Sequence, residues 1–86
     1  MNRPNLLDRI TLNPEICHGK PTIRNTRYMV TAMLGYLAGG DTIEELKEEF
    51  PGTETEDFLA CIAYANAVLL AKESIVVHQL AAGSFS

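Results

Sequence analysis

The sequence predicts a mostly α-helical domain: a three-helix bundle of the helix-turn-helix type (homeodomain-like or winged-helix-like) preceded by a short N-terminal β-hairpin. The chain has 86 residues, enough for one domain, 1–86, and too few for a second. Apolar residues make up 47% of it, an ordinary share for a folded globular protein and too high for a disordered one. Three segments with helically spaced apolar residues follow one another, joined by short turns that contain glycine or proline.

The hairpin is expected within residues 10–24. Ile10 and Leu12 alternate with polar residues, which is the period of a half-buried strand, and an Asn-Pro pair then ends that strand. Residues 22–24 are the predicted return strand. A two-stranded hairpin is marginally stable in water, so this one must pack on the helices or pair with another chain.

The first two helices have clear sequence signals. Apolar residues at i, i+3, i+4 and i+7 from Val30 predict the first helix, which a Gly-Gly pair at 39–40 ends. Thr42 and Glu45 form a predicted capping box that opens the second helix. Its buried face is expected to consist of Ile43, Leu46 and Phe50. The pair Pro51-Gly52 is expected to end the helix.

The third helix is expected to be the longest, with 17 residues or more starting near Thr53 or Thr55. Acidic residues in its first turn suit the helix dipole, and they are interpreted as solvated or capping groups. One apolar stripe is predicted along it, comprising Phe58, Cys61, Ile62, Ala65, Val68 and Leu69. Beyond Lys72 the pattern is compatible with either a helix or a strand. Ile75, Val76 and Val77 are β-branched, which favours a strand, whereas Val76 and Leu80 continue the apolar stripe of the helix.

Charge divides the chain into two parts. Residues 1–30 carry five basic and two acidic residues, a balance of +3, whereas residues 31–86 carry two basic and nine acidic residues, a balance of −7. Such a split indicates that the two parts meet different surroundings.

The sequence contains no pattern typical of a catalytic or metal site. Cys17 and His18 are adjacent, while Cys61 and His78 lie in different elements, and neither spacing matches a metal site or a Cys-His catalytic pair. Cys61 is interpreted as a small core residue and Cys17 as a loop residue. No metal, no cofactor and no enzymatic activity are therefore expected.

DNA binding is an open alternative at this point. In a helix-turn-helix pair the start of the second helix meets the bases, but here that stretch has three negative charges in four residues and would repel phosphates. The candidate nucleic-acid-binding residues are instead the basic residues of the first third, Arg9, Lys20, Arg24 and Arg27. The same residues could equally be surface charges or partners of the acidic helices.

The run ITLNPEICHGKPTIRNTR from Ile10, followed by the helical segments IEEL and EDF, resembles the bacterial and archaeal "domain of unknown function four-three-three" family. The resemblance covers about residues 10–66, so residues 67–86 are read as an extension of the last helix plus a tail. Positions in register include Pro14, Gly19, Pro21, Thr26, Arg27, Glu44, Glu45, Pro51, Glu56, Asp57, Ala60 and Tyr64. Asn25 replaces the family's glycine, and asparagine also tolerates a left-handed conformation.

The resemblance implies a helix-turn-helix-like homodimer that acts as an antitoxin by binding and neutralising a PIN-like ribonuclease toxin. It also implies the alternative of a transcriptional regulator that binds operator DNA of its own operon. An acidic protein suits a nuclease that binds RNA through a basic surface. The candidate partner-binding residues are the apolar ones near the C-terminus, Ile75, Val76, Val77 and Leu80. A third alternative keeps the dimer but assigns it some other protein partner.

The expected location is the bacterial cytoplasm. The first ten residues lack the apolar core of a signal peptide, and the longest apolar stretches are shorter than the roughly 20 residues that span a bilayer. No membrane association is expected, and both cysteines are expected to be reduced thiols.

Overall fold

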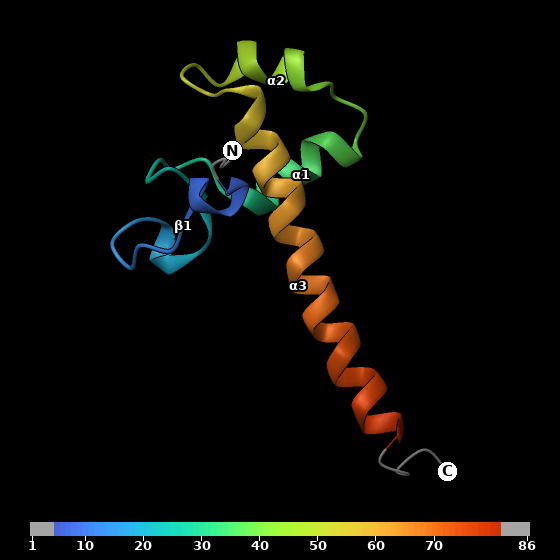
Figure 1. Ribbon diagram of the computed structural model, residues 1–86. Helices are drawn as coiled ribbons and strands as arrows, with labels where there is room; N and C mark the ends of the chain where they lie inside the picture. The colour runs from blue at the N-terminus through green and yellow to red at the C-terminus, as the bar shows by residue number, and fades with distance from the viewer. Residues whose placement is uncertain (1–4, 82–86) are drawn as a thin grey trace.

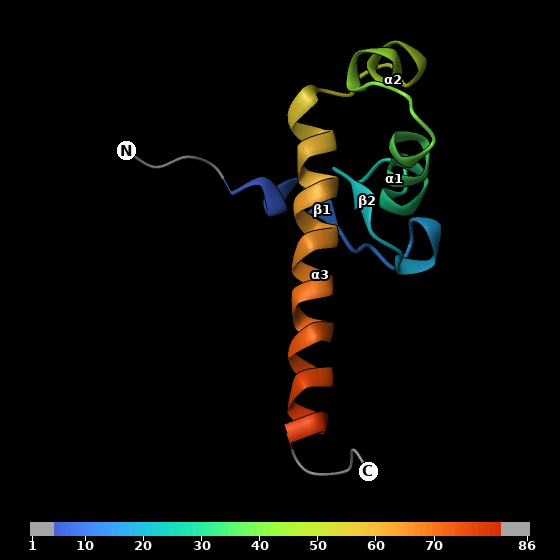
Figure 2. The same ribbon diagram turned by 90° about the vertical axis from the view of Figure 1, so that its right-hand side faces the viewer.

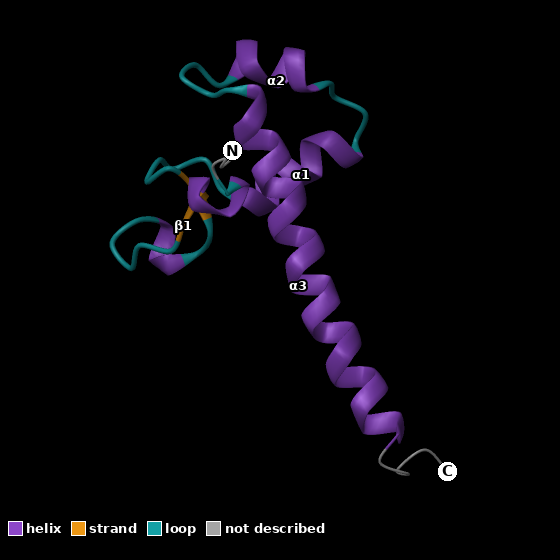
Figure 3. Cartoon of the chain, in the orientation of Figure 1, coloured by secondary structure: helices purple, strands orange, loops and turns teal. Residues whose placement is uncertain are grey.

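The computed structural model describes the backbone of residues 5–81 and the side chains of residues 5–73 (Figure 1). Three α-helices follow an N-terminal portion that contains two short strands and two 3-10 turns (Figure 3). In chain order the elements are η1 (Leu6–Arg9), β1 (Ile10–Thr11), η2 (Cys17–Gly19), β2 (Thr22–Ile23), α1 (Val30–Ala38), α2 (Ile43–Glu49) and α3 (Thr55–Ala81). The predicted mostly α-helical fold with a preceding hairpin is confirmed.

The hairpin is antiparallel and very short. Ile10 pairs with Ile23 and Thr11 with Thr22, and the two threonine hydroxyls lie 3.1 Å apart. Ile23 and Thr22 are fully buried, so this strand pair packs on the helices, as a marginal hairpin must. The prediction that Leu12 lies on a half-buried strand is wrong, because β1 ends at Thr11 and Leu12 is 60% exposed.

The core lies where the hairpin, α1 and α2 meet the first turns of α3. Its buried apolar side chains are Ile23, Val30, Met33, Leu46, Phe58 and Cys61. The predicted inner faces of the first two helices are confirmed, with Ile43 and Phe50 partly buried against this cluster. Cys61 is a buried core residue, as expected from its sequence context.

The predicted helix ends are also confirmed. The Thr42 hydroxyl accepts the Glu45 N–H at 3.1 Å, and the Glu45 carboxylate accepts the Thr42 N–H at 2.8 Å, which completes the capping box. Gly39 caps α1, and Gly40 follows it with a φ of 107°. Asn25 has a φ of 60°, so asparagine adopts the left-handed conformation that its position requires.

Two glycines of this region should respond in opposite directions to alanine. Gly40→Ala is expected to lower the free energy of unfolding by about 1–2 kcal/mol, because its positive φ is unfavourable for a residue with a Cβ. Gly35→Ala is the matched control: a Cβ there meets no atom within 4 Å, and alanine is the better residue inside α1, so unfolding should cost about 0.5–1 kcal/mol more. Urea titration of both variants tests this, and the same sign for both would contradict it.

The third helix extends far beyond the core. Figure 2 shows α3 as a long column with α1, α2 and β2 beside its first half, while its second half projects alone. The predicted single apolar stripe is therefore buried only in part, since Ala65 is half-buried and Val68 is 38% exposed. Phe58 and Cys61 are buried, but Ile62 is 46% and Leu69 57% exposed, because the other elements reach only part of this helix.

The question of helix or strand near the C-terminus is settled in favour of helix, which continues to Ala81. The side chains of Ile75, Val76, Val77 and Leu80, the candidate partner-binding residues, lie outside the described ones. Among the described residues, no helix combines the length and the apolar character needed to cross a membrane.

Candidate functional site

The centre of the candidate site is Asp57, which is fully buried in the first turn of α3. Arg24 binds its carboxylate with two nitrogens: Nε donates to Oδ1 at 2.9 Å and Nη2 donates to Oδ2 at 2.6 Å. Arg9 Nη1 donates to Oδ1 at 3.0 Å. The backbone N–H of Glu54 donates to Oδ2 at 2.8 Å, so the same carboxylate also caps the start of α3. Both carboxylate oxygens of this buried acid therefore accept hydrogen bonds, from the two arginines and from the backbone N–H at the start of α3.

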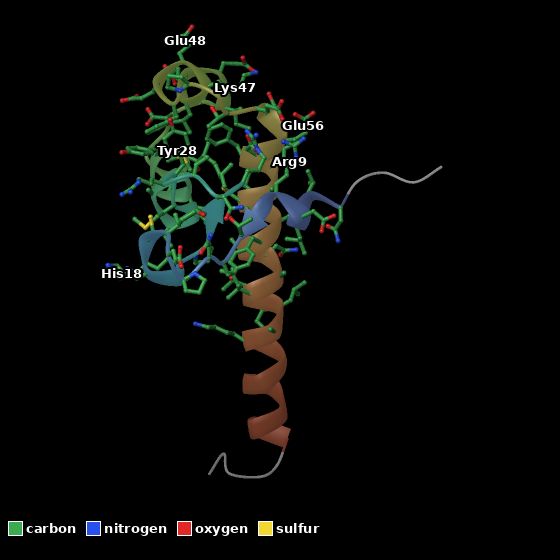
Figure 4. The ribbon with its side chains drawn as sticks, turned by 90° about the vertical axis from the view of Figure 1, so that its left-hand side faces the viewer. Arg9, His18, Tyr28, Lys47, Glu48 and Glu56 are labelled. Carbon is green, nitrogen blue, oxygen red and sulfur yellow. The ribbon has the colours of Figure 1, made fainter. Side chains whose placement is uncertain are left out.

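The hairpin brings the two arginines together. Arg9 immediately precedes β1 and Arg24 immediately follows β2, so they occupy adjacent positions across the strand pair, and the Arg24 N–H donates to the Arg9 carbonyl at 2.8 Å. Arg24 has a φ of 43° at the turn that follows β2. Both side chains converge on the first turn of α3, where Figure 4 places Arg9 beside Glu56.

Two further contacts extend this arrangement, which we call the Asp57 cluster (Asp57, Arg9, Arg24 and Glu54). Arg9 Nη1 donates to Glu54 Oε1 at 2.7 Å, and Arg24 Nη2 donates to the carbonyl of Gly52 at 2.8 Å. The cluster therefore joins η1, the hairpin, the turn between α2 and α3, and α3 itself. Its first role is structural, since it fixes α3 and the turn before it to the N-terminal portion.

Opposing effects set the charge state of Asp57. Burial alone would raise the pKa of its carboxyl, but hydrogen bonds from Arg24, from the Glu54 N–H and from Arg9 outweigh burial and lower this pKa below its ordinary value. Hydrogen bonds to Glu54 and Asp57 raise the pKa of Arg9, and those to Asp57 raise the pKa of Arg24. All three groups are therefore charged at neutral pH.

This shift predicts a loss of stability in acid. Because the pKa of Asp57 is lower in the folded state, its contribution is fully present above the unfolded pKa of about 3.9 and is lost as pH falls through the folded value. The free energy of unfolding should thus fall as pH decreases from about 5 to 2. Asp57→Asn should show a smaller fall, measured by denaturant titration at each pH. An unchanged pH profile in that variant would contradict the assignment.

The Cys61 thiol has no such reactive character. Burial, together with the nearby charge of Asp57, raises its pKa to about 11, so it stays protonated in the core. Among the residues that the structure describes, no three His, Cys, Asp or Glu side chains gather as a metal site would need.

The four basic residues that the sequence suggested for nucleic-acid binding differ in their partners. Arg9 and Arg24 belong to the Asp57 cluster, whereas Lys20 and Arg27 are exposed and join none of the described ion pairs. Arg27 lines a shallow groove together with Arg24. The interpretation of the α3 first-turn carboxylates as solvated is wrong for Asp57, although its capping role is confirmed. The available sequence signal was an acid three residues after the helix cap, with two arginines at paired hairpin positions.

The end of the molecule at α2 and the start of α3 is acidic. Figure 4 shows Glu48 and Lys47 on α2 and Glu56 on the adjoining turns of α3. We call this surface the acidic end; its exposed carboxylates are those of Glu44, Glu45, Glu48, Glu49, Glu54 and Glu56. Lys47 neutralises part of it, pairing with Glu44 at 3.3 Å. Arg9 pairs with Glu54, and within residues 5–73 no cation pairs with Glu48, Glu49 or Glu56.

Comparison with known proteins agrees with this architecture. A crystal structure of a DUF433 member protein from Anabaena variabilis, at 2.00 Å resolution, is similar with a TM-score of 0.63 and 33% sequence identity, over 76% of this chain and 66% of that one. An uncharacterised protein of Sinorhizobium fredii, y4eO, is 31% identical over 75 residues, which are 87% of this chain. The chain spans only about a third (34%) of that relative's length. The sequence model described as "Protein of unknown function (DUF433)" matches residues 10–65, and the chain therefore belongs to this family, as its sequence motifs indicated.

Proposed function

We propose that this chain is a non-enzymatic, antitoxin-like protein whose acidic end binds and neutralises a PIN-like ribonuclease. The observation that carries the proposal is the Asp57 cluster. It engages two of the four basic residues on which DNA binding would rely, and its Glu54 is one of the exposed carboxylates of the acidic end. A nuclease that grips RNA through a basic surface presents the complementary charge.

The acidic end is suited to a protein partner in a second respect. Four of its six carboxylates stand on α2, which the capping box and the buried Leu46 hold in place, so these charges are presented from a fixed helix. Binding to a prearranged surface loses less conformational entropy than binding to a flexible one.

Co-expression with the product of the adjacent gene tests the proposal, with a purification tag on this chain alone. We expect a stoichiometric complex in which ribonuclease activity is suppressed. Glu48→Lys with Glu49→Lys should weaken the complex at least about tenfold, chiefly through a slower association rate. Lysine at the end of α2 suits the helix dipole, so these substitutions should leave the fold intact.

The matched control is Asp8→Lys with Glu15→Lys, which changes the net charge equally at exposed positions outside the acidic end. It should bind as the unaltered chain does. Absence of a complex, or equal losses in both double variants, would overturn the proposal. A complex whose nuclease remains active would leave a protein-binding module with a different purpose.

A transcriptional regulator is the second candidate, supported by the exposure of Lys20 and Arg27. If these residues contact phosphates, affinity for the chain's own promoter should fall with salt, and Lys20→Ala with Arg27→Ala should reduce the slope of log affinity against log salt by about 2. Lys72→Ala is the control. Arg24 is unsuitable for this test, because its replacement also breaks the ion pair with Asp57.

A further inference from the structure

A shallow groove lies between the turn that follows β2 and the turn that joins α2 to α3. Its volume is about 320 Å³, close to the lower end of the range for small-molecule sites. Two arginines, an aromatic ring and the α2–α3 turn contribute its principal lining residues, Arg24, Arg27, Tyr28, Pro51, Gly52 and Thr53. The groove therefore combines positive charge with a ring surface in a space that suits one small molecule.

Both arginines keep unused hydrogen-bond donors. Arg24 binds Asp57 and the Gly52 carbonyl through Nε and Nη2, so its Nη1 makes none of the hydrogen bonds described within residues 5–73. The exposed guanidinium of Arg27 makes none of them either, and the same holds for the backbone N–H groups of Arg27 and Gly52. Guanidinium and backbone N–H groups commonly bind phosphate oxygens. The groove thus supplies several donors to an anion.

The two arginines are held by fixed parts of the fold. Asp57 orients the Arg24 guanidinium through two hydrogen bonds. The Thr26 hydroxyl donates to the last carbonyl of β2 at 2.6 Å and accepts the Tyr28 N–H at 3.1 Å, which fixes the backbone on both sides of Arg27. A site that is arranged before its ligand arrives loses less conformational entropy on binding.

The ring of Tyr28 provides an aromatic surface beside these charges. Its hydroxyl donates to the Pro51 carbonyl at 3.3 Å, and the ring packs edge-on against Phe50 with ring centroids 5.2 Å apart. Figure 4 shows Tyr28 below α2. The side chain is only half-buried, so part of the ring is available to a ligand in the groove. Nucleotide bases stack on aromatic rings and on guanidinium planes, and a planar base therefore suits this surface.

We propose that this groove binds a nucleoside 5′-monophosphate, with the phosphate on Arg27 and on Nη1 of Arg24 and the base against the Tyr28 ring. The hydroxyls of Tyr28 and Thr53 already donate to backbone carbonyls, so towards a ligand their oxygens can only accept hydrogen bonds. The ribose hydroxyls supply the matching donors. The site thus recognises an anion, a sugar and a planar ring together.

The net charge of the groove comes from Arg27. Arg24 is balanced by Asp57. Glu54, the nearest carboxylate in the sequence to the α2–α3 turn of the groove, is paired with Arg9 at 2.7 Å. Replacement of Arg27 therefore removes most of the attraction for an anion without disturbing the Asp57 cluster.

NMR titration of the ¹⁵N-labelled chain with AMP tests the proposal. We expect the amide resonances of Gly52 and Thr53 to shift with a dissociation constant of about 1 mM or lower, while that of Gly35 on α1 stays in place. Adenosine, which lacks the phosphate, should bind at least about tenfold more weakly. Ribose 5-phosphate, which lacks the base, should bind at least about fivefold more weakly.

Substitution of Arg27 tests its role directly. Arg27→Ala should weaken AMP binding at least about tenfold, and Arg27→Lys should fall between this variant and the unaltered chain, because lysine keeps the charge but not the planar pair of donors. The Arg27 side chain is exposed, so both variants should keep their circular dichroism spectra. The matched control, Lys20→Ala, removes the same charge at an exposed position outside the groove and should bind AMP unchanged.

Several results would overturn the nucleotide site: no shift with AMP, equal affinity for adenosine or for ribose 5-phosphate, or equal losses in Arg27→Ala and Lys20→Ala. Neither a ribonuclease nor DNA is present in these experiments. The acidic-end variant Glu48→Lys with Glu49→Lys should bind AMP as the unaltered chain does, because neither residue lines the groove. The nucleotide site and the proposed function therefore fail independently.

Discussion

Asp57→Ala is expected to lower the free energy of unfolding by about 3 kcal/mol, because it leaves two arginines without their shared partner and the start of α3 without its cap. Loss of one member of a buried ion pair typically costs about 3–5 kcal/mol. The lower end applies here, since the side chains of Arg9 and Arg24 are 29% and 40% exposed and regain water. In a domain of this size the melting temperature should fall by roughly 12–24 °C.

Thermal and urea unfolding of Asp57→Ala, Arg24→Ala, the double variant and Glu56→Ala measures how much of this loss comes from the Arg24–Asp57 ion pair. Arg24→Ala should cost less than Asp57→Ala, because Arg9 still pairs with the acid. The double variant should cost less than the sum of the two single variants, since both break the same ion pair. Glu56→Ala, an exposed carboxylate in the same helical turn, should change stability by no more than about 0.5 kcal/mol. An equally small effect for Asp57→Ala would show that the cluster contributes nothing.

Phe58→Ala should be the most destabilising single substitution, at about 4 kcal/mol. Phe58 is fully buried at the point where α3 meets the hairpin, α1 and α2, so truncation loses the transfer free energy of the ring and leaves a cavity. A domain of 86 residues has a total stability of roughly 4–13 kcal/mol, and the variant should be largely unfolded at 37 °C if the chain lies near the lower figure.

Urea titration followed by circular dichroism measures this loss. Phe58→Leu should recover part of it, because leucine fills some of the cavity. Leu12→Ala is the control: Leu12 is 60% exposed, and its truncation should cost about 0.5 kcal/mol or less. A similar cost for Phe58→Ala and Leu12→Ala would mean that the core is not centred on Phe58.

The order of the elements was predictable because their signals are local. The capping box of α2, the glycines after α1 and the i, i+3, i+4 spacing from Val30 each involve residues within two helical turns. The hairpin was predictable for the same reason, although its strands proved shorter than the alternation indicated.

The sequence left open that the arginines pair with the acidic helices, as Arg9 and Arg24 do, but did not indicate which carboxylate they bind, because that depends on contacts between distant parts of the chain. A first-turn carboxylate looks the same in sequence whether it is solvated, like that of Glu56, or buried beneath arginines, like that of Asp57. The hairpin register and the docking of α3 decide between the two. Likewise, periodicity assigned Ile62 and Leu69 to the core stripe but carried no information on how far the other elements reach along α3.

The arrangement around Asp57 has a consequence for how the chain folds. Its ion pairs join residues 33 and 48 positions apart in the sequence, so a loop of that length must close before each bond can form. Helices α1 and α2, stabilised by local contacts, need no such closure. We therefore expect the cluster to form after the folding barrier is crossed. Substitutions in it should accelerate unfolding more than they slow folding, which gives the acid and its two arginines control over the lifetime of the native state.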